Sequence, residues 1–148
     1  MSAQPRHHIG QLLVQLTRLF QNELFARLVD AGLTDARISH THVTAYIKAD
    51  GSRLTELAEQ ARLTLPAMSE IVSDLEALGA VERRPDPTDG RAKLICLTDA
   101  GWEAIRTAQA VIREIERDYA QRIGEARFDR TAHGLEALLT ALTEDAAD

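Results

Sequence analysis

The chain has 148 residues, of which 45% are hydrophobic, 27% are charged and 4% are aromatic. This length suits one domain with a substantial core, which we expect to span 1–148. Plentiful Leu, Ala and Ile with only four prolines favour a mainly helical protein over a β-sandwich or a disordered chain. The net charge of −6 excludes a surface that is basic throughout, so any contact with nucleic acid must come from a local basic patch.

The sequence contains no candidate for a membrane-spanning helix. Its longest apolar run is Leu94 to Leu97, whereas a spanning helix needs about 20 residues. Residues 1–8 lack the apolar core of a signal peptide, so we expect a cytoplasmic protein with no membrane partner. Cys96 is the single cysteine, which excludes an intramolecular disulfide and leaves a buried, inert thiol as the preferred interpretation.

Apolar residues recur at spacings of three and four near both ends of the sequence, which predicts long helices over 8–31, 99–123 and about 129–145. Gly32 is placed to end the first helix. At about 36 Å this helix would be longer than a DNA-binding lobe of about 60 residues is wide. We therefore expect 8–37 and 99–148 to pair with a second copy in a homodimer. The alternative is a monomer in which the terminal helices fold back on the core.

Between the long helices, capping residues predict three shorter ones. Ser39 would cap a helix that carries Val43, Tyr46 and Ile47 and ends at Asp50-Gly51. Thr55 would cap a second helix that reaches Ala61. Thr64 would cap a third, which tolerates Pro66 in its first turn and ends at Gly79.

The last two of these helices have the spacing of a helix-turn-helix. Small and apolar residues stand where two crossing helices would pack, at Leu57, Ala58, Ala61, Leu63, Met68 and Ile71. Arg62 occupies the turn position that often holds glycine. The second helix would offer its outer face to a DNA major groove, with Ala67, Ser69, Glu70, Ser73 and Asp74. A three-helix core that does not bind DNA could have the same pattern.

A β-hairpin is expected next, because the helical period disappears after Ala80. Extended runs over 81–84 and 91–97 flank a polar tip at 85–90. Four cations lie close together on it: Arg83, Arg84, Arg91 and Lys93. Beside a recognition helix, such a tip can lie along a DNA minor groove. In isolation it would be a solvated edge strand protected by charge.

These residues resemble the winged-helix signature of MarR-type transcriptional regulators. The resemblance lies in the stretch Leu75 to Arg91, with an Asp-x-Arg at Asp89 and Arg91, and in the Leu-Thr-x-x-Gly of residues 97–101. Leu57-Ala58 and Ile38-Ser39 extend it over about 38–101. It implies a mainly α winged helix-turn-helix with a small hairpin wing over 38–98 and long terminal dimerisation helices. It also implies a homodimeric, mostly repressive protein whose affinity for a palindromic operator responds to a small molecule, a metal or oxidation.

The resemblance assigns roles to single residues. Ser69, Glu70 and Ser73 would face base edges, and Arg91 would enter the minor groove with its guanidinium held by Asp89. The residues near the start of the motif would approach phosphates: Arg53, Thr55, Arg62 and Thr64. Two features differ from similar proteins, since Glu70 and Asp74 are acidic where basic or neutral residues are common, and no cysteine lies early in the first helix.

The effector site is the least visible element of the sequence. The position of the pocket in similar proteins points to Leu12, Leu16, Phe20, His42, Tyr46, Trp102 and Ile105. Each apolar member could equally be ordinary core, and His42 could bind an acidic ligand or respond to pH. We expect an aromatic or acidic effector and no cofactor. Two histidines at 40 and 42 face different sides of a helix, so no metal site is expected.

Two other classes of protein remain to be considered. The common catalytic motifs are missing from the sequence, namely the P-loop, Gly-x-Gly-x-x-Gly, His-Glu-x-x-His and Gly-x-Ser-x-Gly, so we expect no enzyme. The second class is a winged-helix module that associates with proteins and binds DNA weakly or not at all. The acidic residues on the expected recognition helix favour this alternative.

Overall fold

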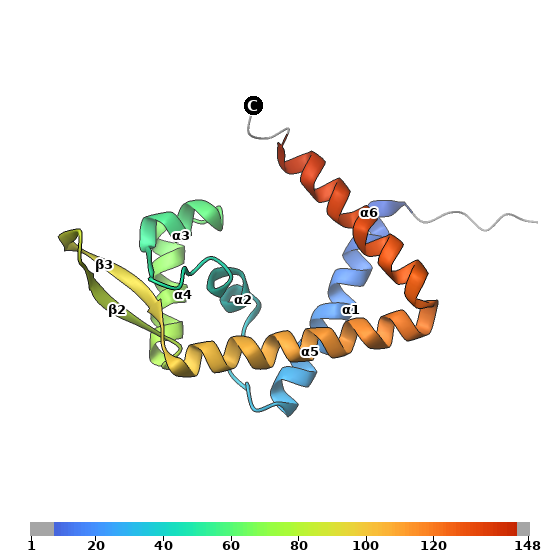
Figure 1. The fold of residues 1–148 in the computed structure, drawn as a ribbon, viewed down its shortest axis with the longest axis horizontal. Helices are drawn as coiled ribbons and strands as arrows, with labels where there is room; N and C mark the ends of the chain where they lie inside the picture. Colours follow the sequence, from blue (N-terminus) through green and yellow to red (C-terminus); the bar gives the residue numbers. More distant parts are fainter. Residues whose placement is uncertain (1–7, 145–148) are drawn as a thin grey trace, which may run out of the picture. The chain divides into compact units, whose positions relative to one another are not determined.

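The computed structural model describes residues 8–144, apart from the side chain of His42. These residues form two compact units, one ending at Gln109 and one beginning at Ala110, inside one long helix. Helices predominate, with a small antiparallel sheet whose two longer strands lie between the fourth and fifth of them (Figure 1). The prediction of a mainly α winged-helix fold is thus confirmed.

The helices of the first unit contribute unequally to one apolar core, which is formed mainly by the middle ones. Their bounds are α1 (Ile9–Asp30), α2 (Ile38–Thr44), α3 (Leu54–Gln60), α4 (Leu65–Ala77) and the first part of α5 (Asp99–Ile123). The core joins the middle helices to the base of the sheet and consists of Val43, Ile47, Leu57, Ala58, Met68, Val72, Leu75, Val81, Ile95 and Leu97. The expected helix-turn-helix residues Leu57, Ala58 and Met68 are all buried here.

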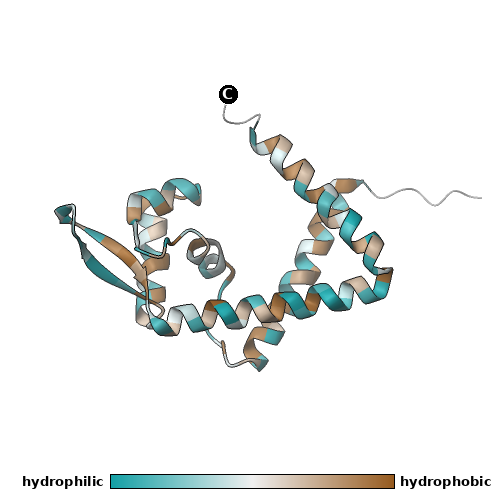
Figure 2. Ribbon diagram, in the orientation of Figure 1, coloured by the Kyte–Doolittle hydropathy of each residue, from teal (hydrophilic) through white to brown (hydrophobic). Residues whose placement is uncertain are grey.

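The sheet has three antiparallel strands in the order β1-β3-β2, with β1 (Ser52–Arg53), β2 (Val81–Asp86) and β3 (Asp89–Leu97). Val81 pairs with Leu97 at the base of the hairpin. The base is hydrophobic and buried, whereas the tip is hydrophilic and exposed (Figure 2). The hairpin formed by β2 and β3, which we call the wing, is therefore packed into the core at its base and exposed along most of its tip.

Helix α4 begins and ends as the sequence predicts. The Thr64 side-chain oxygen accepts a hydrogen bond from the backbone N–H of Ala67 at 3.3 Å, and proline stands in the first turn, where no backbone donor is needed. Gly79 then adopts a left-handed conformation with φ of 72°. The chain turns there from α4 directly into the wing.

The start of α5 packs closely on the chain that leaves α4. The Thr98 hydroxyl donates to the carbonyl of Gly79 at 2.6 Å and accepts from the N–H of Gly101 at 3.0 Å. A Cβ added at Gly101 would lie 2.0 Å from the carbonyl oxygen of Ala80. Only glycine fits at this position, so the Leu-Thr-x-x-Gly sequence has a packing reason.

Helix α2 is shorter than predicted and begins earlier. It starts after Arg37 rather than at Ser39 and ends at Thr44, so Tyr46 and Ile47 lie in the turn that follows. The Ser52 side chain explains the early end. Its hydroxyl accepts from the N–H of Lys48 at 3.0 Å and donates to the carbonyl of Tyr46 at 3.3 Å. These bonds replace those that would have continued the helix.

Three further boundaries differ from the prediction. Thr55 does not cap α3, because the two residues of β1 pair with β3 and the chain enters the helix directly at Leu54. Both strands of the wing extend further into the tip than expected. The last helix, α6 (Glu125–Glu144), begins four residues early because Gly124, with φ of 90°, is the sole break after α5.

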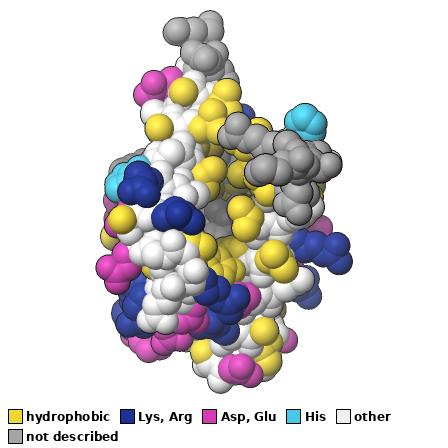
Figure 3. Space-filling view, turned by 90° about the vertical axis from the view of Figure 1, so that its right-hand side faces the viewer, with side chains coloured by type: hydrophobic (Ala, Val, Ile, Leu, Met, Phe, Trp, Pro, Cys, Tyr) yellow, Lys and Arg dark blue, Asp and Glu magenta, His cyan; other side chains and the backbone are white. Residues whose placement is uncertain are grey.

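The second unit consists of the later part of α5 and α6. Helix α6 has no buried residue in this single chain. Four of its leucines are exposed: Leu135, Leu138, Leu139 and Leu142. In the space-filling view of Figure 3, hydrophobic side chains, drawn in yellow, lie at the molecular surface. Among the described residues, no helix is long and apolar enough to cross a membrane.

Candidate nucleic-acid interface

The outer face of α4 is polar and carries no cation. Glu70 and Ser73 are exposed, Ala67 and Ser69 are half-buried, and the opposite face is in the core. The hydroxyl of Ser73 donates to the carbonyl of Ser69 at 2.8 Å, which leaves its lone pairs free to accept. The helix therefore offers mostly acceptors to a partner.

Asp74 lies on the same side of α4 as Glu70, but its carboxylate is already paired within the protein. Its Oδ2 accepts from Arg37 Nη1 at 3.0 Å and lies 4.0 Å from His40 Nε2. Four residues turn an α-helix by about 400°, so Asp74 is rotated about 40° from Glu70. This rotation directs the carboxylate toward the start of α2 and provides it with a cation that the sequence pattern did not reveal.

The cations of the wing fall into two groups. Arg83 pairs with Glu76 at 3.2 Å, and Arg84 pairs with Glu82 on its own strand. Arg91 and Lys93 are exposed and have no ion-pair partner among the described residues. These two cations are thus the part of the wing with charge available for a polyanion.

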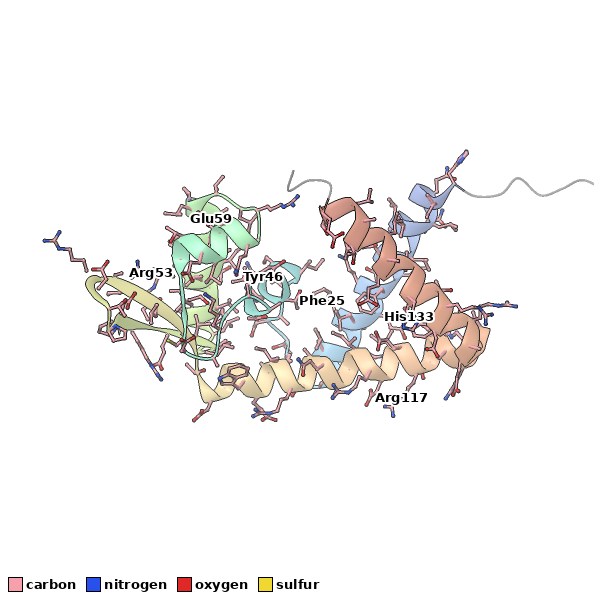
Figure 4. The ribbon with its side chains drawn as sticks, turned by 45° about the horizontal axis from the view of Figure 1, so that its top comes forward. Phe25, Tyr46, Arg53, Glu59, Arg117 and His133 are labelled. Carbon is pink, nitrogen blue, oxygen red and sulfur yellow. The ribbon has the colours of Figure 1, made fainter. Side chains whose placement is uncertain are left out.

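Arg53 is part of the wing's support. Its Nε and Nη2 donate to Asp86 Oδ2 at 2.8 and 2.5 Å, which ties β1 to the far end of β2 (Figure 4). The other oxygen of Asp86 accepts from both the N–H and the hydroxyl of Thr88, at 2.8 and 2.7 Å. The bonds from Thr88 and then from Arg53 lower the pKa of Asp86 from 3.8 to about 2.

The predicted bond between Asp89 and the Arg91 guanidinium is wrong. Asp89 Oδ1 accepts from the backbone N–H of Arg91 at 3.1 Å, and its Oδ2 is 3.9 Å from Arg53 Nη2. Asp89 therefore shapes the turn through the backbone, because a short side chain reaches an N–H two residues on more readily than a guanidinium that points to solvent.

The turn between α3 and α4 contributes one further cation. Arg62 is exposed and adopts φ of 53°, in the left-handed region expected for a position that often holds glycine. Thr64 is exposed at the start of α4, but its side chain is engaged in the cap. Thr55 is exposed in the first turn of α3.

A cavity of about 320 Å³ lies in the first unit, beside α2. Parts of α1, α2, α4 and α5 line it: Leu28, Gly32, Leu33, Thr34, Asp35, Ala36, His40, Thr41, Thr44, Leu75, Leu78, Ala80, Ala100, Gly101, Ala104, Ile105 and Ala108. His40, Thr41 and Thr44 lie on one helix, so α2 provides much of its polar lining.

Of the predicted effector residues whose side chains the structure describes, Ile105 alone lines this cavity. Leu12, Leu16 and Trp102 are exposed, and Phe20 is half-buried. Tyr46 lies in the turn after α2 and is exposed. The side chain of His42 lies outside what the structure describes. Sequence reasoning missed His40, which it weighed as a metal ligand alone. Residues 8–144, without that side chain, contain no cluster of three potential ligands for a metal.

Comparison with known proteins accounts for this architecture. Residues 31–92 match the model of the MarR family. The HTH-type transcriptional regulator YdcH of Bacillus subtilis is 29% identical over 117 residues, which cover 78% of this chain and 80% of the relative. The HTH-type transcriptional repressor Rv2887 of Mycobacterium tuberculosis is 29% identical over 78% of this chain and 81% of the relative.

Residues 31–92, which hold most of the winged helix, are thus of the MarR type, and the chain is similar over most of its length to HTH-type transcriptional regulators.

Solved MarR-type structures share the fold of nearly the whole chain. The Staphylococcus aureus regulator MepR superposes with a TM-score of 0.72 at 20% identity, over 92% of this chain and 99% of MepR. YusO from Bacillus subtilis gives 0.70 at 22% identity, over 90% and 93%. A MepR–DNA complex also matches, with a TM-score of 0.72 at 19% identity over 92% and 99%. The named relatives are transcriptional regulators, not enzymes.

Proposed function

We propose that this MarR-type protein is a homodimeric repressor that binds a palindromic operator and releases it in response to a small molecule. One observation carries the DNA-binding part of the proposal: the wing and the α3–α4 turn hold cations without ion-pair partners among the described residues, beside a helix that exposes polar acceptors. Local positive charge gives affinity for phosphates, and acceptors on a helix can read base donors. A regulator of chromosomal DNA would work in the cytoplasm.

The homodimer is supported by apolar residues that one chain leaves exposed. Val14 on α1 is 71% exposed and Leu139 on α6 is 65% exposed, and neither is alone on its helix. Burial of each such side chain contributes about 1.5–3 kcal/mol. A second copy could cover both helices, and a two-fold pair of lobes would match two half-sites about one DNA turn apart. The expected roles of 8–37 and 99–148 in dimerisation belong to this proposal.

Repression and ligand response are supported by named relatives and by the cavity beside α2. Rv2887 is named a transcriptional repressor, which favours the same sign of control here. MepR has a structure bound to ethidium bromide, and the cavity beside α2 has a size typical of small-molecule sites. The predicted effector residues other than Ile105 would take part only if the dimer or a ligand rearranged the site.

The test of DNA binding is fluorescence anisotropy with the DNA upstream of the protein's own coding sequence and with random DNA of equal length, at two salt concentrations. We expect tighter binding to the upstream DNA than to random DNA. The ratio of these two affinities should not fall as the salt concentration rises, because nonspecific binding depends most on salt. Equal affinity for both DNAs would contradict operator recognition.

The test of assembly is sedimentation at micromolar concentration. We expect about twice the chain mass of 16.3 kDa, and we expect removal of 125–148 to abolish the dimer. A matched variant with Leu139→Glu and Leu142→Glu keeps the chain length and should dissociate as well. A soluble, folded and monomeric full-length protein would contradict the proposal.

A module for protein association is the second candidate function. The exposed Glu70 on α4, without a cation on the same face, favours it. The anisotropy experiment separates the two candidates, because an association module would bind both DNAs weakly and equally. Failure of DNA binding with an intact dimer would favour this candidate.

A further inference from the structure

One side chain of the cavity has a hydrogen-bond donor with no acceptor. The Nδ1 of His40 accepts from the backbone N–H of Arg37 at 3.3 Å, so the proton of the neutral ring is on Nε2. That Nε2 is buried and has no hydrogen-bond partner among the described residues. The nearest carboxylate oxygen, Asp74 Oδ2, is 4.0 Å away, which is beyond hydrogen-bond distance. His40 as a whole is only 6% exposed.

The other polar side chains of the cavity use their protons within the protein. The Thr41 hydroxyl donates to the carbonyl of Ile38 at 2.7 Å, and the Thr44 hydroxyl donates to that of His40 at 3.0 Å. Thr34 is 3.4 Å from the carboxylate of Asp35. The remaining lining is apolar. The Nε2–H of His40 is therefore the side-chain donor that an occupant could satisfy, and an unmet buried donor is costly.

We propose that this cavity binds an uncharged, largely apolar molecule whose oxygen accepts a hydrogen bond from His40 Nε2. A ketone, quinone or ether oxygen on an aromatic body has the required chemistry. The inference rests on the proposed ligand response and specifies its chemical class. It replaces the acidic effector and the role for His42 that the sequence suggested.

The charges around the cavity oppose an acid. No Lys or Arg is among the described residues that line it, while the carboxylate of Asp35 is. Asp74 and Arg37 face His40 and neutralise each other through their ion pair. Burial, and then the charge of Arg37, lower the pKa of His40, so its ring is neutral at neutral pH. An anion would enter without a countercharge, which is expensive in an apolar site. A cation would lack the acceptor that Nε2–H requires.

The site also lies beside the contact between α2 and α4. His40 Nε2 is 4.0 Å from the same Asp74 oxygen that accepts from Arg37 at 3.0 Å. An oxygen bound at Nε2 would come close to that carboxylate and disturb its pairing. A ligand in the cavity would thus affect α4, the helix proposed to face DNA, through the side chains of His40 and Asp74.

Four probes with one naphthalene skeleton test the ligand class: 2-acetylnaphthalene, 2-ethylnaphthalene, 2-naphthoate and 1-(2-naphthyl)ethylamine. Binding to the full-length protein without DNA is measured by titration calorimetry. We expect the ketone to bind about tenfold more tightly than the hydrocarbon, and the acid and the amine to bind more weakly than the ketone. Tightest binding by the acid or the amine would overturn the proposal, as would equal binding of ketone and hydrocarbon.

Variants then locate the hydrogen bond. His40→Leu should bind ketone and hydrocarbon equally, and His40→Gln, which keeps an N–H donor, should retain part of the preference. His133→Leu is the matched control, since His133 is exposed on α6, and it should behave as the wild type. If folded His40→Leu still bound the ketone more tightly than the hydrocarbon, the hydrogen bond could not be assigned to His40. If His40→Leu does not fold, loss of the whole preference in folded His40→Gln would overturn the assignment instead.

The closing measurement separates this inference from the proposed function. The affinity for upstream DNA is titrated with and without the ketone in wild type and in His40→Leu, which lacks the N–H donor. Binding of the ketone through His40 with unchanged DNA affinity would refute the ligand response and leave the site assigned. Release of DNA by the ketone in both proteins alike would refute the site and retain the response.

Discussion

The wing and helix α4 belong to the same lobe, yet they offer opposite charges to a partner. The wing exposes Arg91 and Lys93 without ion-pair partners among the described residues, whereas the outer face of α4 exposes Glu70 and hydroxyls. Under the proposed function, phosphate affinity would depend on the wing and the α3–α4 turn, while α4 would add repulsion that only a correct base pattern could offset. In this protein affinity and sequence reading are expected to reside in separate elements.

The largest effect is expected when the wing loses its free arginine. Arg91→Ala should weaken binding to upstream DNA by at least about tenfold per dimer, because two minor-groove contacts disappear, and this requires only about 1.4 kcal/mol. Anisotropy titrations at matched salt measure it, with sedimentation and thermal melting as controls for an intact dimer. Unchanged DNA affinity would assign Arg91 to an ordinary solvated edge.

A smaller effect is expected when the wing loses its support. Asp86→Asn should weaken DNA binding by about fivefold, because the tip would no longer be held in one conformation by Arg53 and Thr88. It should also lower the melting temperature in a pH-dependent manner. The folded protein lowers the pKa of Asp86 from 3.8 to about 2, so the carboxylate stabilises the fold above about pH 4 and loses that effect as pH falls toward 2.

Melting curves of wild type and Asp86→Asn between pH 2 and pH 7 test the predicted pH dependence of the melting temperature. The gap in melting temperature should be constant above about pH 4 and should narrow below it. A gap that stays constant down to pH 2 would show that the ionised carboxylate does not support the wing.

Removal of the exposed acid on α4 should have a smaller effect with the opposite sign. Glu70→Gln should raise affinity for random DNA by about threefold and for upstream DNA by less, because a glutamate that accepts from a cytosine amino group recovers part of its cost at the correct site. Parallel titrations of both DNAs decide it. An equal rise for both would mean that Glu70 repels phosphate without reading a base.

The smallest effect is expected from Arg84→Ala. Arg84 is already paired with Glu82, so its loss should change DNA affinity by less than about twofold. Arg84 and Arg91 lie on the same wing, which makes this variant the matched control for Arg91→Ala. Equal losses from both variants would contradict the distinction between paired and free cations.

The local features of the lobe could be predicted because their causes lie within a few residues. Thr64 caps α4 through an N–H three residues on, and Gly79 ends that helix in a conformation that glycine adopts without strain. The apolar positions of the helix-turn-helix follow the helical period, so Leu57, Ala58 and Met68 are in the core as predicted. Leu63, in the turn, is exposed instead.

The missed features depend on residues far apart in the sequence. Arg53 and Asp86 are separated by 33 positions, and Arg37 and Asp74 by 37. No periodicity shows which acid a given arginine will meet after folding, so the sequence predicts Arg53 at phosphate and does not reveal that Arg37 pairs with Asp74. The early end of α2 has the same origin, since it depends on a side-chain bond from Ser52 in the next element.

The left-handed backbone of Arg62 sets the stability of the lobe against its proposed affinity for DNA. A non-glycine residue at φ of 53° stores about 1 kcal/mol of conformational strain that glycine would relieve. Arg62→Gly would thus raise the melting temperature of the lobe and remove a cation from the DNA-facing turn in the same step. A screen for heat-resistant variants of this protein would be drawn toward glycine at position 62, and the variants that it selects would bind DNA less tightly.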